Sequence, residues 1–291
     1  MINQADNLRN IVKLQNQKQI TNARVIAVTS GKGGVGKSNT SINLALQFQR
    51  MGKRVIIIDA DFGLANIEVM FGIVPKYTLG DLMFTGKSLA EIITKGPEGV
   101  GFISGGSGIA KMVNLDKEQV RRLVGKLSDL EDIADVVIID TGAGISNTVM
   151  EFLVAVPEMI LVTTPEPTSI TDSYALLKAL GIHPDFNRSS TKIKMIANRV
   201  SGEAEGLNLY EKLNAVVERF LNVNMEYLGI VPYDNNINKA VMKQQPVSLL
   251  YPDSISSKNY ERIVQVLEKG SADVVNLGIR GFFRSVFSRK I

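Results

Sequence analysis

The sequence predicts an α/β fold, with a doubly wound, mostly parallel sheet that carries helices on both faces. Seven apolar runs are continuous rather than alternating, which is typical of parallel strands buried on both sides. Segments with helical periodicity lie between these runs, and strand–helix alternation favours an open parallel sheet. We expect strands at residues 24–30, 54–60, 99–105, 135–141, 158–164, 192–199 and 225–232. We expect helices near residues 37–50, 116–130, 146–154, 166–181, 205–221 and 254–269.

Composition excludes several classes of site. The 291 residues are enough for one large domain. There is no cysteine, which excludes disulfides, thiolate metal sites and a thiol nucleophile. The single histidine, His183, excludes a catalytic triad and a histidine metal site. No apolar run approaches the ~20 residues that cross a bilayer, and the N-terminus lacks a signal-peptide core, so we expect a cytoplasmic protein.

The basic charge is concentrated at the C-terminus. The net charge is +4, and the last twelve residues, RGFFRSVFSRKI, hold four basic side chains and no acid. The rest of the chain is therefore electrically balanced. These totals do not indicate a basic face for nucleic acid, although they leave a local patch open.

Residues 29–40, TSGKGGVGKSNT, match two nucleotide-binding patterns. The glycines of 31–36 fit the dinucleotide fingerprint, with Asp59 at the end of the next strand. They also fit the Walker A loop, and the following Lys37 and Ser38 decide between the two. A triphosphate needs both residues, because lysine reaches the β and γ oxygens and the serine hydroxyl binds Mg²⁺. We therefore predict a triphosphate site rather than a dinucleotide site or a plain glycine-rich turn.

Lys32 is a second lysine in this loop, and the Walker motif does not require it. Its side chain could point away from its own nucleotide and reach a triphosphate held by a second copy of the chain. There it would add positive charge where the transition state spreads negative charge. The alternative is a solvated loop lysine, and the residues alone do not choose between the two.

Three aspartates follow predicted strands, at the sheet edge where ligands bind in open α/β folds. Asp59 and Asp61 lie two residues apart, and Asp140 follows four apolar residues as in a Walker B strand. Because Mg²⁺ keeps several waters, Asp59 and Asp140 could act on it through water. The alternative for each is a turn-forming residue after a strand.

These motifs together resemble one family. KGGVGKS is similar to the deviant Walker A motif of the MinD/ParA ATPases, DADFGLAN to their switch I and DTGAG to their switch II. The resemblance implies a MinD-like P-loop NTPase that binds ATP and Mg²⁺ and in which Lys32 acts across an ATP-sandwiched homodimer. It further implies that Asp61 activates the attacking water and that Asp140 senses the γ-phosphate. The Mg²⁺ residues would be Ser38, Asp59 and Asp140.

Two later stretches match the base-binding positions of the family. IANRV places Asn198 at a strand end, where its amide could pair with the edge of adenine. VPYDNN places Pro232, Tyr233 and Asp234 after another strand, where Asp234 could accept a hydrogen bond from an exocyclic amine of the base or from the ribose. Either side chain could instead cap the following helix. The implied ATP-binding residues are Gly31, Lys32, Gly33, Gly34, Val35, Gly36, Lys37, Ser38, Asn39, Asn198, Arg199, Pro232, Tyr233 and Asp234.

The C-terminal segment 273–291 has an amphipathic helical pattern. Apolar side chains share one face, and Arg280 and Arg284 lie on the other. This pattern suits an interfacial membrane helix on anionic lipid, as members of the family carry. It also suits a helix docked on its own domain, and each could apply in a different nucleotide state. The expected membrane-binding residues are Ile279, Phe282, Phe283, Val286 and Phe287.

The N-terminal segment 1–20 precedes the first strand and carries a short apolar stripe. It reads as a partner-binding peptide, a disordered leader or a helix packed on its own domain. NQADNLR resembles the DQAxxLR motif of FlhG proteins, the flagellar-number branch of the MinD/ParA family, with Asn3 in place of the aspartate. The resemblance implies activation of an FlhF-type GTPase. The partner-binding residues would be Gln4, Ala5, Leu8 and Arg9.

The sequence thus predicts three parts: a partner segment (1–20), an ATPase domain (21–272) and a membrane-targeting helix (273–291). The resemblance implies a regulator of flagellum number and placement at the inner face of the cytoplasmic membrane. Its partners would be an FlhF-type GTPase and flagellar C-ring or basal-body proteins. We expect no specific binding to nucleic acid. The alternatives are a MinD-type division ATPase, a ParA-type DNA partition ATPase and a metabolic P-loop enzyme.

Overall fold

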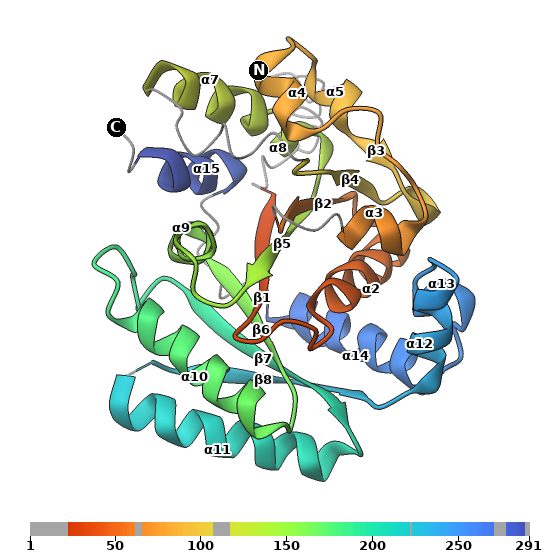
Figure 1. Ribbon diagram of the computed structural model, residues 1–291, viewed down its shortest axis with the longest axis vertical. Coiled ribbons are helices and arrows are strands. Elements are labelled where there is room, and N and C mark those ends of the chain that lie inside the picture. The colour runs from red at the N-terminus through yellow and green to blue at the C-terminus, as the bar shows by residue number, and fades with distance from the viewer. Residues whose placement is uncertain (1–22, 62–65, 107–116, 222, 271–277, 289–291) are drawn as a thin grey trace, which may run out of the picture.

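The computed structural model describes residues 23–61, 66–106, 117–221, 223–270 and 278–288 (Figure 1). These residues form an eight-stranded sheet in the order β3-β4-β2-β5-β1-β6-β7-β8. Every neighbouring pair is parallel except β3 with β4. The predicted fold class is confirmed. The strands are β1 (Arg24–Ser30), β2 (Val55–Ala60), β3 (Thr94–Lys95), β4 (Gly101–Ile103), β5 (Val136–Ala143), β6 (Glu158–Thr163), β7 (Lys192–Val200) and β8 (Met225–Pro232).

Helices cover both faces of the sheet. Figure 1 shows α9, α10 and α15 on one side and α2 and α14 on the other. Successive residues of β1 point into opposite cores: Val25 packs with the first group of helices, and Ile26 with the second. The helices are α2 (Lys37–Arg50), α3 (Asn66–Phe71), α4 (Leu79–Phe84), α5 (Leu89–Ile92), the 3₁₀ turn η1 (Pro97–Gly99), α7 (Lys117–Ser128), α8 (Leu130–Ile133), α9 (Asn147–Ala155), α10 (Pro167–Gly181), α11 (Glu203–Leu221), α12 (Asn235–Met242), α13 (Val247–Leu250), α14 (Ile255–Lys269) and α15 (Gly278–Ser288).

The sequence pattern missed the short elements. Helices α3, α4, α5, α12 and α13 and the antiparallel strand β3 were not expected, and the predicted helix 116–130 is divided into α7 and α8. Such helices span only one or two turns, so apolar periodicity cannot define them. Two of them begin with capping boxes instead, formed by Thr78 with Asp81 and by Ser88 with Glu91.

Buried ion pairs join three strands at the amino edge of the sheet. Glu158 of β6 is fully buried and accepts two hydrogen bonds of 2.8 Å from Arg24 of β1. Lys194 of β7 lies 2.8 Å from the same carboxylate. Burial raises the pKa of Glu158, but Arg24 and then Lys194 outweigh this and hold the pKa below its usual range. The central strands are therefore fixed at the edge opposite the glycine-rich loop.

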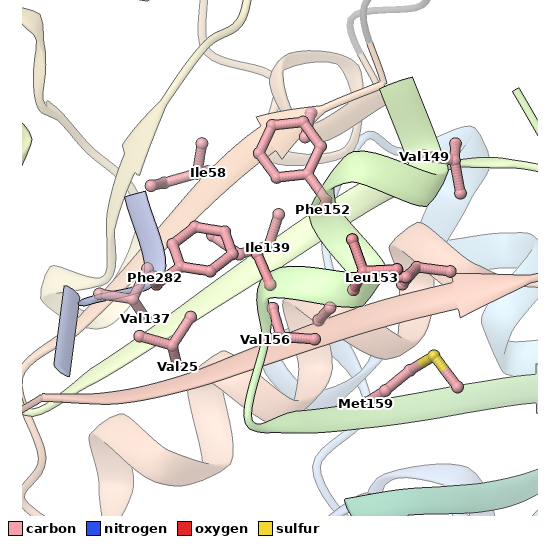
Figure 2. Close-up of a cluster of buried hydrophobic side chains, with 14 of the residues drawn as sticks. Val25, Ile58, Val137, Ile139, Val149, Phe152, Leu153, Val156, Met159 and Phe282 are labelled. Carbon is pink, nitrogen blue, oxygen red and sulfur yellow. The ribbon is translucent and has the colours of Figure 1, made fainter. Parts of the chain in front are cut away.

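The C-terminal helix α15 is part of the hydrophobic core. Ile279, Phe282, Phe283 and Val286 are at most 2% exposed. The helix packs on α7, α8, α9 and β1. The rings of Phe152 on α9 and Phe282 stack with centroids 6.1 Å apart, above Val137 of β5 (Figure 2). The predicted apolar face exists, and in this conformation the domain covers it.

Candidate nucleotide site

The glycine-rich loop connects β1 to α2 at the carboxyl edge of the sheet. Gly36 caps α2 in the left-handed region, with φ 95°. A Cβ at Gly36 would overlap the side chain of Asn198, and a Cβ at Gly31 would overlap the backbone of Asp172 on α10. The loop is therefore enclosed by β7 on one side and α10 on the other. This close packing explains why glycine is needed at 31 and 36.

A cavity of about 480 Å³ lies against this loop. The loop residues Gly33, Lys37 and Ser38 line one part of it, and Asp61 and Asn66 line another. A smaller recess of about 170 Å³ adjoins it through Gly36, Asn39 and Arg199, which line both. The N-terminus of α2 faces the loop, so backbone N–H groups and the helix dipole favour an anion there.

Lys37 forms a buried cluster with Asp140. Its Nζ lies 3.0 Å from Asp140 Oδ1 and 3.5 Å from the Ser38 hydroxyl. Ser41 donates a second hydrogen bond, 2.7 Å long, to the same oxygen of Asp140. Asp140 Oδ2 is buried and has no hydrogen-bond partner among the described residues. A carboxylate oxygen in that position can accept a water or a cation.

Asp59 lies opposite Asp140 in the register of β2 and β5. Its carboxylate accepts hydrogen bonds from the N–H groups of Asp61 and Ile67. Burial raises the pKa of Asp59 to about 7, and the negative charge of Asp140 adds to the rise. Two buried carboxylates side by side repel each other, and a divalent cation would relieve this repulsion. Together with the free Asp140 oxygen and Ser38, they fit Mg²⁺, a hard cation that takes oxygen ligands.

Asp61 follows β2 and lies beside Gly142 of the predicted switch II. Its carboxylate accepts a hydrogen bond of 3.1 Å from Asn66, and Gly142 lies beside it, because a Cβ there would come 3.6 Å from Asp61 Oδ1. Burial raises the pKa of Asp61, and the charge of Lys37 opposes the rise. Asp61 thus lines the cavity, where its carboxylate could hold a water. Residues 62–65 of the predicted switch I lie outside the described residues.

Lys32 does not join the Lys37 cluster. Its Nζ lies 2.8 Å from Glu166 Oε2 and 2.7 Å from the Thr168 hydroxyl, at the start of α10. It is not among the residues that line the cavity. The two lysines of the loop are therefore directed to different places, and the action of Lys32 on a second copy stays a prediction.

The predicted base-binding side chains line the recess, but most of their polar groups already have partners. Asn198 donates to Val35 O at 2.6 Å, and Arg199 donates to Gly34 O at 2.9 Å. Asp234 accepts from Asn236 N at 2.9 Å and from the Ser256 hydroxyl at 2.7 Å. Asp234 therefore caps α12, as the alternative interpretation expected, and also binds the start of α14.

The remaining predicted binding residues either line the recess or lie outside the described residues. Pro232 and Tyr233 line the recess, and Tyr233 is largely exposed. Sequence reasoning missed Tyr260 of α14, which lines the same recess; it follows no motif, and only the three-dimensional fold brings it there. The partner-binding residues Gln4, Ala5, Leu8 and Arg9 and the side chain of Phe287 lie outside the described residues. In the described part of the chain, no helix combines the length and apolarity needed to cross a membrane.

Comparisons with known proteins agree with this geometry. Residues 26–247 match the family model described as CobQ/CobB/MinD/ParA nucleotide binding domain. The antiactivator FleN of Pseudomonas aeruginosa is 42% identical over 84% of this chain and 86% of its own length. The flagellum site-determining protein YlxH of Helicobacter pylori is 34% identical over 98% of both chains.

A solved structure supports the fold. The septum site-determining protein MinD of Pyrococcus horikoshii, complexed with Mg-ADP, superposes with a TM-score of 0.66 over 86% of this chain and 98% of that one, at 22% identity. The matching fold, the Walker loop between β1 and α2 and the likeness to FleN and YlxH agree with one another. The chain belongs to the MinD/ParA family of nucleotide-binding ATPases and, within it, to the FlhG branch that includes FleN and YlxH.

Proposed function

We propose that this chain hydrolyses ATP with Mg²⁺ as a dimer and thereby regulates the number and placement of flagella. The observation that carries the proposal is the buried pair of Asp59 and Asp140 beside Lys37, at the mouth of the Walker loop. This arrangement suits a metal bound with a triphosphate, because the metal would neutralise the two buried carboxylates and the phosphates would pair with Lys37. The flagellar names of FleN and YlxH support the biological role.

Each polar group of the site has a role in this proposal. Lys37 would exchange its contact with Asp140 for the β and γ oxygens of ATP, which releases Asp140 toward the metal. Ser38 would bind Mg²⁺ directly, and Asp59 and Asp140 through water. The bound metal would offset negative charge on the phosphates. Asp61 would hold the attacking water, since its carboxylate borders the cavity and its neighbour Asn66 fixes its orientation.

Lys32 would act on the nucleotide of the second copy. In this structure its partners Glu166 and Thr168 belong to the same chain, and all of these contacts lie near the protein surface. A surface ion pair contributes little, roughly 0–1 kcal/mol, so a second copy could readily displace it. Dimerisation around ATP would thus be needed for fast hydrolysis.

Substitution of Asp61 tests this part of the proposal. Asp61→Ala should still bind ATP and accumulate as an ATP-bound dimer, because the phosphate-binding loop is intact while the water-holding carboxylate is lost. Size-exclusion chromatography with ATP and with ADP, beside the wild-type protein, measures this. A monomeric profile of the variant with ATP would count against the dimer, and unchanged turnover would count against the role of Asp61.

The flagellar role would be exerted through the N-terminal segment. A peptide of residues 1–20 should bind an FlhF-type GTPase and raise its GTP hydrolysis, with Leu8 as the apolar anchor and Gln4 and Arg9 as polar contacts. Because a short segment that folds on its partner binds weakly, excess peptide should be needed. Gln4→Ala and Arg9→Ala peptides lack these polar contacts and should raise GTP hydrolysis less than the unchanged peptide at the same concentration. An unchanged GTPase rate at saturating peptide would exclude this partner. Flagellar C-ring or basal-body proteins are further partners on this proposal.

Membrane attachment would use the apolar face of α15. This face is covered by α7 and α9 in the present conformation, so binding to lipid would require the helix to leave the domain. Arg280 and Arg284, on its exposed side, would add attraction to anionic headgroups. Deletion of residues 273–291 should abolish cosedimentation with anionic liposomes in the ATP state. Equal cosedimentation of the full-length and truncated proteins would overturn this attachment.

A further inference from the structure

Asp140 is a buried carboxylate whose two oxygens have different surroundings. The residue is 0% exposed, and its partner Lys37 lines the cavity. Its Oδ1 accepts hydrogen bonds from Lys37 Nζ at 3.0 Å and from the Ser41 hydroxyl at 2.7 Å. Its Oδ2 has no hydrogen-bond partner among the described residues. One oxygen is therefore held by side chains, and the other is left for a group from outside the described chain.

The two donors to Oδ1 differ in what a bound nucleotide would do to them. Lys37 has a long, charged side chain, and in the proposed function it exchanges Asp140 for phosphate oxygens. Ser41 has no such alternative, because it is 0% exposed and is not among the residues that line the cavity. Once Lys37 turns to the phosphates, Ser41 is the described side chain that still donates to Asp140.

Ser41 is fixed in place by α2. It lies one helical turn after Lys37, between the buried Thr40 and Ile42, and α2 packs on β1, β2 and β5. Its hydroxyl also lies 3.2 Å from Lys37 O, but the carboxylate of Asp140 is nearer and carries charge, so it is the stronger acceptor. The short side chain and the packed helix therefore keep the hydroxyl on Asp140.

A hydroxyl at this position can orient Asp140 without neutralising it. It carries no charge, so the negative charge of Asp140 stays available to a cation, whereas an ammonium group would compete with that cation. Side chains that hydrogen-bond to metal-ligating groups fix the orientation of those groups, and their loss weakens metal binding.

We propose that Ser41 is a positioning residue for the Mg²⁺ of the nucleotide site. It would hold Asp140 Oδ1 when Lys37 leaves, so that Oδ2 stays directed to the water shell of the metal. This role rests on the proposed function, since it takes Mg²⁺ and a nucleotide as the ligands. Ser41 should therefore affect nucleotide binding only when Mg²⁺ is present.

The test is isothermal titration calorimetry of the full-length chain with ADP, which is not turned over, in Mg²⁺ and in EDTA. The ratio of the two dissociation constants gives the gain in ADP affinity from Mg²⁺. Ser41→Ala should lower this gain about tenfold, or remove it where the wild-type gain is smaller. The affinity for ADP in EDTA should stay nearly unchanged, because the loop and Lys37 are intact.

Ser173→Ala is the matched control. Ser173 on α10 is also 0% exposed, and it donates one hydrogen bond, 2.9 Å long, to the Thr163 hydroxyl. Both variants lose one buried hydrogen bond, so the nucleotide-free proteins should unfold at similar, slightly lowered temperatures. Ser173→Ala should keep the wild-type gain from Mg²⁺, and Ser41→Ala should not.

The possible failures are distinguishable. A wild-type chain that binds no ADP would overturn the proposed function itself, and one that binds ADP without any gain from Mg²⁺ would remove the metal and, with it, the role of Ser41. If the wild type shows the gain and Ser41→Ala keeps it, the positioning role is wrong. Equal losses of the gain in Ser41→Ala and Ser173→Ala, or equal losses of affinity in Mg²⁺ and in EDTA, would assign the hydroxyl to the fold and would also overturn the proposal.

Discussion

The phosphate-binding edge of the sheet and the docked helix α15 are held by different kinds of contact. At the edge, Lys37, Ser41 and Asp140 form directional hydrogen bonds within a buried polar cluster. Under α15, the contacts are apolar side chains such as Phe152 and Phe282 (Figure 2). Directional bonds require one specific replacement partner, whereas apolar burial can be transferred to any apolar surface, including lipid.

This difference suggests how one region could control the other. A ligand that offers phosphate oxygens and a metal can replace the contacts at the edge, and a membrane can replace the contacts of α15. The two regions meet at α9. Gly142 of the predicted switch II lies between Asp61 and Val149 of α9, and Phe152 follows one turn later and stacks on Phe282. A shift of the predicted switch II could therefore displace α9 and change its contacts with the docked helix α15.

The largest expected effect is at the polar edge. Lys32→Ala should lower ATP hydrolysis by about a thousandfold, the size of effect seen for charges supplied in trans to a phosphoryl transfer. ATP affinity should change little, because Lys37 remains in the loop. Steady-state phosphate release together with nucleotide titration measures both, and Lys53→Ala, at the opposite edge, is the control. If Lys32→Ala hydrolyses ATP at the normal rate, hydrolysis does not need a lysine from a second copy of the chain.

The next effect tests the apolar region. Phe152→Ala should lower the free energy of unfolding by about 3–4 kcal/mol, since a large buried ring is removed from beneath α15. It should also raise liposome binding without ATP, because the docked helix loses its partner. Phe220→Ala is the matched control, as that ring is 63% exposed. Similar losses of stability in both variants on chemical denaturation would show that α15 does not depend on α9.

A third prediction compares the polar edge with the ion pairs at the other end of the strands. Glu158→Gln should cost about 2–3 kcal/mol at pH 7, because Arg24 and Lys194 stay buried with a weaker partner. Glu158 has a lowered pKa, so its contribution is present above its unfolded pKa and is lost as pH falls through the folded value. Wild type and variant should therefore converge in stability between about pH 5 and pH 3. A constant difference across that range would contradict the charge pairing.

The smallest effect tests the close packing of the loop. Gly31→Ala should cost about 1–2 kcal/mol in the nucleotide-free protein, because the added Cβ would overlap the backbone of Asp172 and Ser173. Gly33→Ala is the control, since its Cβ would meet no atom within 4 Å. Equal unfolding temperatures for the two variants would show that α10 does not confine the loop.

The two regions also differ in how far the sequence could predict them. The strands and the loop were predictable, because β1, α2 and β8 have the bounds that periodicity and motif spacing indicate. Asp59 and Asp140 could be placed at one edge because parallel strands bring their carboxyl ends together. The environment of α15 was not predictable, since an amphipathic face is equally suited to a membrane and to its own domain.

Other misses have local physical causes. Asp234 has the geometry of a helix cap, and only the position of Ser256 shows that its second oxygen is used as well. Tyr260 is brought to the recess by the packing of α14 on α2 and β8, which no local pattern records. The partners of Lys32 on α10 depend in the same way on contacts between segments distant in the sequence.

We propose that the nucleotide decides whether the apolar face of α15 is docked. Since the chain has no cysteine, Val286→Cys introduces a single thiol at a position that is 2% exposed. The rate of its reaction with a water-soluble thiol reagent, in the Asp61→Ala background, can be measured with ADP and with ATP. We expect slow modification with ADP and a rate at least about tenfold higher with ATP, as the helix leaves the domain. Equal rates in the two states, with ATP binding verified, would contradict it.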